Sequence, residues 1–184
     1  MIELTHGNLL DADVDALVNT VNSVGCMGKG IALQFKQAFP RNNAFYERAC
    51  QAGKVAPGRM LIFDNGGLVK PHYIINFPTK RHWRGKSKIE DIAAGLTALV
   101  AEVKRLGIRS IAVPALGCGL GGLDWRLVRP MIEEAFSVLP DVRVLAYEPG
   151  GETPPGKTET AVTACNHGRP VASRKRRPVD VGSQ

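Results

Sequence analysis

Two glycine-rich segments and one lysine are the parts of this chain whose residue types and spacing could carry chemistry. The first segment, "NTVNSVGCMGKGIALQF" (19–35), passes from a strand-like stretch through several glycines into an amphipathic pattern. Glycines let a backbone approach a ligand closely, and the free N–H groups at the start of a helix favour an anion. The segment therefore predicts an anion-binding turn. The alternative is a tight turn between a strand and a helix, without a ligand.

The first segment fits neither of two common phosphate-loop patterns. A Walker A loop needs Ser or Thr directly after Gly28 and Lys29, where this chain has Gly30, and it needs Gly in the place of Ser23. The G-x-G-x-x-G spacing of dinucleotide-binding folds is also absent. Lys29 is therefore interpreted as a bystander rather than as a phosphate ligand.

The second segment, "IAVPALGCGLGGLDW" (111–125), has four glycines among residues 117–122, directly after a strand of buried appearance. Each glycine loses much backbone freedom on folding. Four glycines in one turn therefore indicate a backbone that wraps a ligand. Two such segments could hold the two phosphates of a diphosphate on backbone N–H groups. No carboxylate cluster for Mg²⁺ accompanies them.

The elements that must position these segments alternate along residues 1–149. Strands are predicted at 2–5, 16–19, 59–63, 72–77, 110–113 and 142–146. Strands that alternate with helices are typical of an α/β fold with a mostly parallel sheet covered on both faces. Because ligands bind beyond the carboxyl ends of such strands, and both glycine segments follow a strand, we expect the segments to meet at that edge.

Apolar periodicity predicts the helices. They cover residues 31–39, up to Pro40, then 88–106, and 130–138. Ser87 and Glu90 have the spacing of a capping box at the start of the second helix, and Gly107 suits its end. Pro130 interrupts the last pattern, so we predict a turn after Asp124 and a helix that begins at the proline.

Composition and charge restrict the classes of protein. The chain has 184 residues, is 44% hydrophobic and carries a formal net charge of +7, which suggests a polyanionic partner. Residues 150–184 are rich in Gly, Pro, Ser and Thr and have no apolar periodicity, so they predict a basic, disordered tail. The run "RKRR" (174–177) in this tail either contacts nucleic acid or is simply solvated.

The cysteines and histidines do not suggest a metal site. There is no CxxC spacing, and the histidines are not clustered, so no metal is predicted. No apolar run reaches about 18 residues, and the N-terminus lacks the pattern of a signal peptide. We therefore expect a cytoplasmic protein that has no contact with a membrane.

Three stretches of the sequence resemble a known family. They are "GNLLDADVDALVNTVNSVGCMGKGIALQF" (7–35), "IINFPTKRHWRGKSK" (74–88) and "VPALGCGLGGLDW" (113–125). Together they resemble the macrodomains, which bind ADP-ribose, and within them the DNA ADP-ribosyl glycohydrolases, antitoxins that oppose DarT-like toxins. The resemblance covers residues 1–149. It implies a three-layer α/β/α fold with a mixed, mostly parallel central sheet and no cofactor.

The resemblance also implies which residues contact ADP-ribose. The set consists of Asn8, Leu9, Thr20, Val21, Asn22, Gly28, Gly30, Ile31, Thr79, Gly117, Cys118, Gly119, Leu120 and Gly121. In it, Asn8 and Leu9 would contact the adenine, and the two glycine segments would surround the diphosphate. Asn22 would be the polar group closest to the bond that breaks, and Tyr147 would pack near the adenine. From the residues alone, an alternative for Asn22 is an amide that caps a turn.

Lys80 is the candidate catalytic residue. On the residues alone it is one of several cations in "TKRHWRGKSK", for which a solvated loop is the simpler interpretation. In the related glycohydrolases, however, the lysine that ends "NFPTK" is catalytic, and Lys80 has that place. The implied reaction is hydrolysis of the N-glycosidic bond between ADP-ribose and a DNA base, thymine in the best-known members. A lysine could stabilise the leaving base as a cation or proton donor, or attack the ribose as a nucleophile.

One departure separates this chain from a related branch that acts on ADP-ribosylated acidic side chains of proteins. That branch pairs its lysine with an Asp in the second glycine segment, where this chain has Gly121. The next carboxylate, Asp124, is expected to cap a helix. The difference favours the DNA-directed activity. The alternatives are a module that binds ADP-ribose without turnover, and a hydrolase of protein-linked or small ADP-ribose esters.

The neighbours of Lys80 predict contacts to DNA. Arg81, Arg84 and Lys86 could neutralise phosphates, as could Lys88, and Trp83 offers a face for an unpaired base. An alternative for Trp83 is a partly buried anchor of the loop. The resulting partners are ADP-ribosylated single-stranded DNA, ADP-ribose as the product and a DarT-like toxin.

Overall fold

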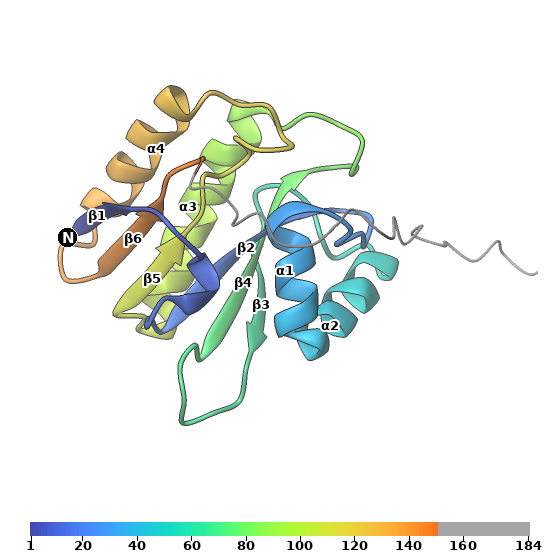
Figure 1. Ribbon diagram of the computed structural model, residues 1–184, viewed down its shortest axis with the longest axis horizontal. Coiled ribbons are helices and arrows are strands. Elements are labelled where there is room, and N and C mark those ends of the chain that lie inside the picture. Colours follow the sequence, from blue (N-terminus) through green and yellow to red (C-terminus); the bar gives the residue numbers. More distant parts are fainter. Residues whose placement is uncertain (151–184) are drawn as a thin grey trace, which may run out of the picture.

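The computed structural model describes residues 1–150, in which a six-stranded sheet lies between two layers of helices (Figure 1). Residues 151–184, and with them nearly all of the predicted tail and its "RKRR" run, lie outside the described residues. The elements are β1 (Ile2–Thr5), η1 (Leu9–Asp11), β2 (Ala16–Asn22), α1 (Gly30–Ala38), α2 (Pro40–Gln51), β3 (Leu61–Asp64), β4 (Tyr73–Lys80), α3 (Ile89–Leu106), β5 (Ser110–Val113), α4 (Trp125–Ser137) and β6 (Arg143–Tyr147).

The order of the strands determines where a ligand can bind. The sheet runs β1-β6-β5-β2-β4-β3, and all neighbouring strands are parallel except β3 and β4. From β5 the chain continues to β6 on one side, whereas from β2 it continues toward β3 and β4 on the other. The carboxyl ends of β2 and β5 therefore form the point of reversal at which α/β sheets bind ligands. The predicted mixed, mostly parallel α/β sheet is confirmed.

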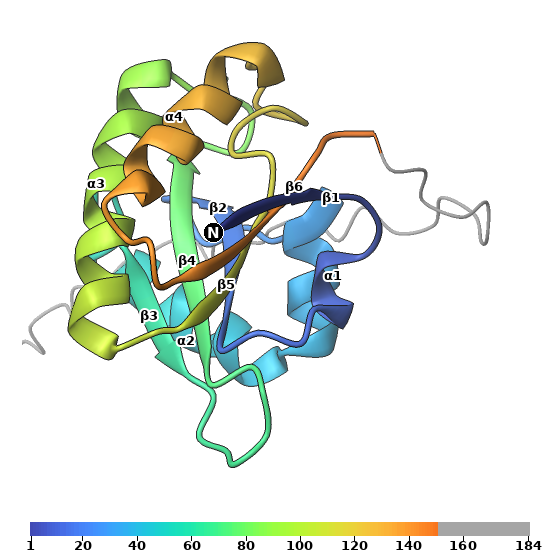
Figure 2. The same cartoon turned by 90° about the vertical axis from the view of Figure 1, so that its left-hand side faces the viewer.

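Two apolar layers hold the helices against the sheet. Helices α3 and α4 cover one face and α1 and α2 the other (Figure 2). The α3–α4 side contains the larger core cluster, in which helix residues such as Leu99 and Ile132 pack with strand residues such as Val18 and Ile111. Buried apolar side chains of this kind contribute on the order of 2 kcal/mol each relative to exposure, so the layers fix the ends of the strands in place.

Strand boundaries and one helix differ from the prediction. The strand predicted at 16–19 continues to Asn22. The strand predicted at 72–77 continues through Pro78 to Lys80, and its pairing with β2 is irregular at Val21/Asn22. That irregularity accommodates a proline, which cannot donate to a regular ladder. Pro40 ends α1, as predicted, but it also begins α2, a helix that the sequence analysis did not predict. The buried face of α2 carries asparagines, which hide its apolar periodicity.

The predicted starts of α3 and α4 were wrong. Helix α4 runs without a break through Pro130, because Val128 and Ile132 are both buried and hold the turns on either side of the proline. Asp124 does cap this helix, since its Oδ1 accepts from the N–H of Arg126 at 2.9 Å. For α3 the N-cap is Lys88, not Ser87, and no side chain caps it. Gly107 ends α3 in the left-handed conformation, with φ of 64°, as predicted.

Candidate functional site

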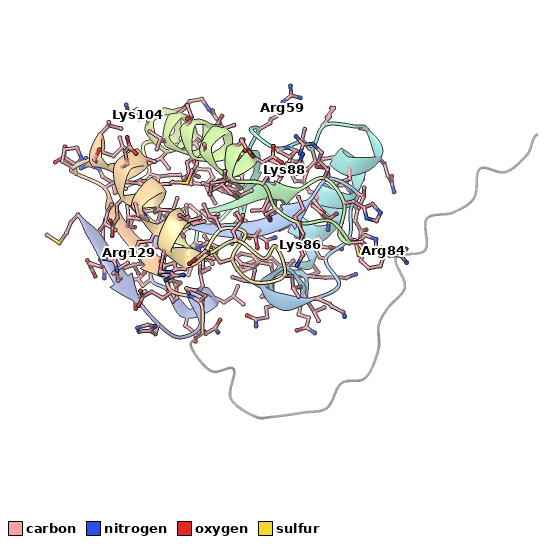
Figure 3. All side chains as sticks on the ribbon, turned by 90° about the horizontal axis from the view of Figure 1, so that it is seen from above. Arg59, Arg84, Lys86, Lys88, Lys104 and Arg129 are labelled. Carbon is pink, nitrogen blue, oxygen red and sulfur yellow. The ribbon has the colours of Figure 1, made fainter. Side chains whose placement is uncertain are left out.

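Three loops meet at the carboxyl ends of the central strands, the end of the molecule seen from above in Figure 3. We call residues 23–29 the first glycine loop, 114–124 the second glycine loop and 81–88 the basic loop. Lys80, at the end of β4, donates from Nζ to the carbonyl oxygens of Leu120 and Trp83, both at 3.3 Å. Asn22 is its register partner at the end of β2. The structure thus brings the predicted lysine and asparagine together beside the second glycine loop.

The two glycine loops face each other across this site. A Cβ placed on Gly30 would lie 3.7 Å from Cδ1 of Leu120, whose side chain is 62% exposed. The basic loop is tied to the same place, because the N–H of Ser87 donates to the carbonyl oxygen of Gly121 at 3.0 Å. These contacts bring Lys80 together with Leu120, about forty positions later in the sequence, and with Gly30, about fifty positions earlier.

The amide of Asn22 shapes the first glycine loop. Its Oδ1 accepts from the N–H groups of Val24 and Cys26 at 3.0 and 3.3 Å, and its Nδ2 donates to the carbonyl oxygen of Cys26 at 2.6 Å. The side chain is 6% exposed. In this structure Asn22 therefore caps the turn, which was the alternative interpretation of the sequence.

Tyr46 supports Asn22 from below and was missed by the sequence analysis. Its hydroxyl lies 2.7 Å from the backbone oxygen of Asn22 and 3.1 Å from Oδ1, and the residue is fully buried in α2. Burial raises the pKa of the Tyr46 hydroxyl, so the group stays protonated and donates. A tyrosine in an unpredicted helix gives no signal in the sequence, because only the fold places it under the loop.

We expect Tyr46→Phe to weaken ADP-ribose binding several-fold and to lower the free energy of unfolding by about 1 kcal/mol, since one buried hydrogen bond is lost. Calorimetric titration and denaturant unfolding measure the two effects. Tyr73→Phe is the matched control, because the Tyr73 hydroxyl makes no hydrogen bond within residues 1–150. Equal values for the two variants would contradict a role for Tyr46 in holding the loop.

Unpaired backbone N–H groups in the second glycine loop and at the start of α1 indicate a site for an anion. In the second loop, the N–H groups of Cys118, Gly122 and Leu123 are used in turns. Within the described residues, those of Gly119, Leu120 and Gly121 donate to no protein acceptor, and neither do those of Gly30 and Ile31 at the start of α1. Lys29, the N-cap of α1, provides no side-chain cap. The unpaired N–H groups at the start of the helix can bind one phosphate, and those of the facing loop can bind a second one.

The second glycine loop leaves no room for a side chain at Gly121. A Cβ there would overlap the carbonyl oxygen of Gly117 and Oγ of Ser87. Gly117 has φ of 73°, and its Cβ would lie 2.9 Å from Cδ1 of Leu123. Both positions therefore require glycine. The absence of an acid at Gly121 follows from packing, because Ser87 is buried directly behind the loop.

Electrostatics at Lys80 differ from those of a solvated lysine. The side chain is half-buried, and burial, followed by the charge of Lys86, lowers the pKa of Lys80 below its ordinary value. A lowered pKa beside loops that could bind a ligand is typical of a functional group. The thiol of Cys118 is not available as an anion, because burial raises its pKa to about 11.

The basic loop contains both paired and unpaired cations. Arg81 forms two hydrogen bonds with Asp91 of α3, at 2.6 and 3.0 Å, so its guanidinium is already occupied. Trp83 is 43% exposed, stacks with His82 at 5.6 Å between ring centroids, and has the Arg84 guanidinium 4.5 Å from its ring centroid. This partial burial, with contacts inside its own loop, agrees with the alternative interpretation of Trp83 as a partly buried anchor, and it does not exclude contact with a base. It leaves an indole surface near Lys80 that a base could contact.

Several residues of the predicted ADP-ribose set serve the scaffold. Leu9 is 4% exposed and belongs to the core cluster on the α1 side. Asn8 caps η1, since its Oδ1 accepts from the N–H of Leu10 at 3.2 Å. Thr79 is buried and donates to the carbonyl oxygen of Val21 at 3.4 Å, which joins β4 to β2. These side chains position the backbone of the site.

A cavity of about 310 Å³ lies elsewhere, near the amino ends of β2 and β4. Its lining includes Asp15, His72 and Gly107, and none of the predicted site residues. Asp15 is occupied there by the N–H groups of Arg109 and Ser110. Within residues 1–150 no three His, Cys, Asp or Glu side chains are arranged to bind a metal ion. In the same range no helix combines the length and the apolar composition needed to cross a membrane.

Comparisons with known proteins agree with this geometry. A family model described as "Macro domain" matches residues 18–132. The chain is 53% identical over 149 residues to the DNA ADP-ribosyl glycohydrolase of Thermus aquaticus, a match that covers 81% of this chain and 41% of that protein. The chain thus spans about two fifths of the length of this curated relative.

Solved structures match as well. The macrodomain of Mycobacterium tuberculosis DarG superposes with a TM-score of 0.80 at 53% identity, over 82% of this chain and 99% of that one. The structure of Thermosipho africanus DarTG in complex with ADP-ribose superposes with a TM-score of 0.73 at 34% identity, over 80% of this chain and 41% of that one.

Proposed function

Because this chain belongs to the Macro domain family, we propose that it is an ADP-ribosyl glycohydrolase that removes ADP-ribose from modified thymidine in single-stranded DNA. The observation that carries the proposal is the position of Lys80: a half-buried cation with a lowered pKa, between two glycine loops with unpaired N–H groups. The identity of 53% with a relative named DNA ADP-ribosyl glycohydrolase supports the same activity.

The site divides into a part that binds and a part that reacts. The N–H groups of Gly30 and Ile31 at the start of α1, and of Gly119 to Gly121 across from them, would hold the diphosphate. Backbone donors are rigid and uncharged, so they bind a dianion without a metal ion. The ribose would then lie toward the ends of β2 and β4, where Lys80 and the capped turn at Asn22 adjoin.

In the reaction, the bond between the ribose anomeric carbon and the base breaks, and its electron pair leaves with the base. Water adds its hydroxyl to the anomeric carbon, and its proton reaches the base. We assign Lys80 to the leaving base, as an ammonium that stabilises the negative charge, because the two carbonyl oxygens that accept from Nζ favour its charged form. Nucleophilic attack by a neutral Lys80 is the alternative.

The position of Gly121 favours DNA over protein carboxylates as the substrate. A carboxylate that assists Lys80 has no place at position 121, because a Cβ there would overlap Gly117 and Ser87, and Asp124 is used as the cap of α4. A departing base that is itself an anion mainly needs a cation, which Lys80 provides. The relatives extend beyond the part that this chain spans, so reversal of a DarT-like toxin, contact with that toxin and a cytoplasmic location are proposed from the resemblance.

A comparison of two substrates tests the proposal. We expect the protein to release ADP-ribose from a thymidine-modified oligonucleotide at least about a hundredfold faster than from a glutamate-modified peptide, measured by chromatography of free ADP-ribose. Faster release from the peptide would support the protein-directed alternative. Tight binding of ADP-ribose without release from either substrate would support a binding module.

A further inference from the structure

Four exposed cations follow one another across the end of the molecule that carries the site (Figure 3). Arg84 and Lys86 lie in the basic loop, Lys88 directly precedes α3, and Arg59 lies between α2 and β3. In the view from above, Lys88 appears between Arg59 and Lys86. We call these four residues the basic track.

The track is continuous because two separate segments pack together. A Cβ on Gly58 would lie 3.3 Å from Cβ of Ala94, so the segment that carries Arg59 lies against the second turn of α3. Lys88 is the N-cap of the same helix. The sequence gives no hint of this arrangement, since Arg59 and Lys88 are separated by β3, β4 and the basic loop.

The cations of the track are available to a ligand. Within residues 1–150, none of the four has a carboxylate oxygen within 4.0 Å. In contrast, Arg81 is paired with Asp91 and Arg129 with Glu133. Neighbouring cations that have no carboxylate partner attract the phosphates of a nucleic acid.

The track starts at the candidate catalytic group. Lys86 lies against the second glycine loop, since a Cβ on Gly122 would be 3.0 Å from its Nζ, and after burial its charge is the second cause of the lowered pKa of Lys80. On the other side, Lys80 is bordered by the carbonyl oxygen of Leu120 and by the two glycine loops. Because the glycine loops are assigned to the diphosphate, a strand attached to a base at Lys80 has an attractive path along Lys88 toward Arg59.

We infer that the basic track binds the phosphates of nucleotides that flank the modified base on one side, in the direction of Arg59. This inference rests on the proposed function. Each phosphate neutralised on a single strand changes log K by about 0.7 per unit of log salt concentration. Four contacts give a slope of about −2.8, which is about fifty-fold weaker binding at 200 mM than at 50 mM salt.

Fluorescence anisotropy tests the track through binding rather than turnover. The probe is a labelled, thymidine-modified oligonucleotide, titrated at several salt concentrations against the protein with its track intact and against the double variant Arg59→Gln/Lys88→Gln, all proteins carrying Lys80→Ala so that the probe is not consumed. We expect the double variant to reduce the magnitude of the slope by about 1.4, which corresponds to two lost contacts. Oligonucleotides extended only 5′ or only 3′ of the modified base are titrated in parallel, and one polarity should account for most of the slope.

Lys104→Gln is the matched control, because it removes one charge from the far end of α3, about 24 Å from Lys88 at 1.5 Å per residue. It should keep the slope of the protein with its track intact. An unchanged slope in the double variant would contradict binding of phosphates by the basic track. An equal reduction of the slope in Lys104→Gln would contradict it as well. Loss of turnover on every substrate with the expected slopes would overturn the proposed function instead and leave the track in place.

Discussion

Lys80→Ala is expected to slow release of ADP-ribose from modified DNA by about a thousandfold, while free ADP-ribose still binds within about threefold of wild type. Charge stabilisation and proton donation at a leaving group each contribute about a hundredfold to a thousandfold. Lys80 lies beside Asn22 at the ends of β4 and β2, and its ammonium donates to the carbonyl oxygen of Leu120. ADP-ribose binding survives because its proposed donors are backbone N–H groups.

Lys29→Ala is the control for this variant, since Lys29 is an exposed lysine in the first glycine loop and the N-cap of α1. It should release ADP-ribose at nearly the wild-type rate. Equal activity of the two variants would contradict the assignment of Lys80. Borohydride treatment during turnover distinguishes the routes, because only nucleophilic attack forms an adduct at Lys80 that can be trapped; such an adduct would contradict the electrostatic role.

Gly121→Ala should disrupt the second glycine loop, with a loss of about 1–3 kcal/mol in the free energy of unfolding and at least tenfold weaker ADP-ribose binding. The added methyl would overlap the carbonyl oxygen of Gly117 and Oγ of Ser87, so the loop must shift relative to both and lose its present shape. Denaturant unfolding and calorimetric titration measure the two effects.

Gly119→Ala is the matched control. It also replaces a glycine of the second glycine loop by alanine, but a Cβ on Gly119 meets no atom within 4 Å. Its free energy of unfolding should stay within about 0.5 kcal/mol of wild type. If Gly121→Ala were as stable as Gly119→Ala, the close approach of Ser87 to the loop would not determine the residue at 121.

Periodicity and turn chemistry were sufficient for the parts of the fold that depend on local sequence. The strands at 2–5 and 110–113 and the glycine end of α3 were predicted from local patterns. Long-range packing decided the rest. Pro130 breaks an isolated helix, but the buried side chains around it keep α4 intact. Helix α2 was missed because asparagines and Tyr46 form its buried face.

For the site, the sequence predicted the backbone segments better than the tasks of individual side chains. Both glycine loops and Lys80 meet at the reversal of the strand order, as expected for an α/β sheet. Side-chain tasks depend on partners that only the fold supplies. Arg81 is paired with Asp91, and the amide of Asn22 is committed to its own turn. Neither Tyr46 nor Arg59 carries a local signal, since both act from segments that the sequence does not connect to the site.

The most direct test of the central claim is single-turnover release of ADP-ribose from a thymidine-modified single strand, with enzyme in excess and the products identified by mass. The account predicts that wild type yields free ADP-ribose and an oligonucleotide with unmodified thymine, and that Lys80→Ala leaves the strand modified on the same timescale. A strand that stays modified with wild type, or that is restored equally well by Lys80→Ala, would contradict it.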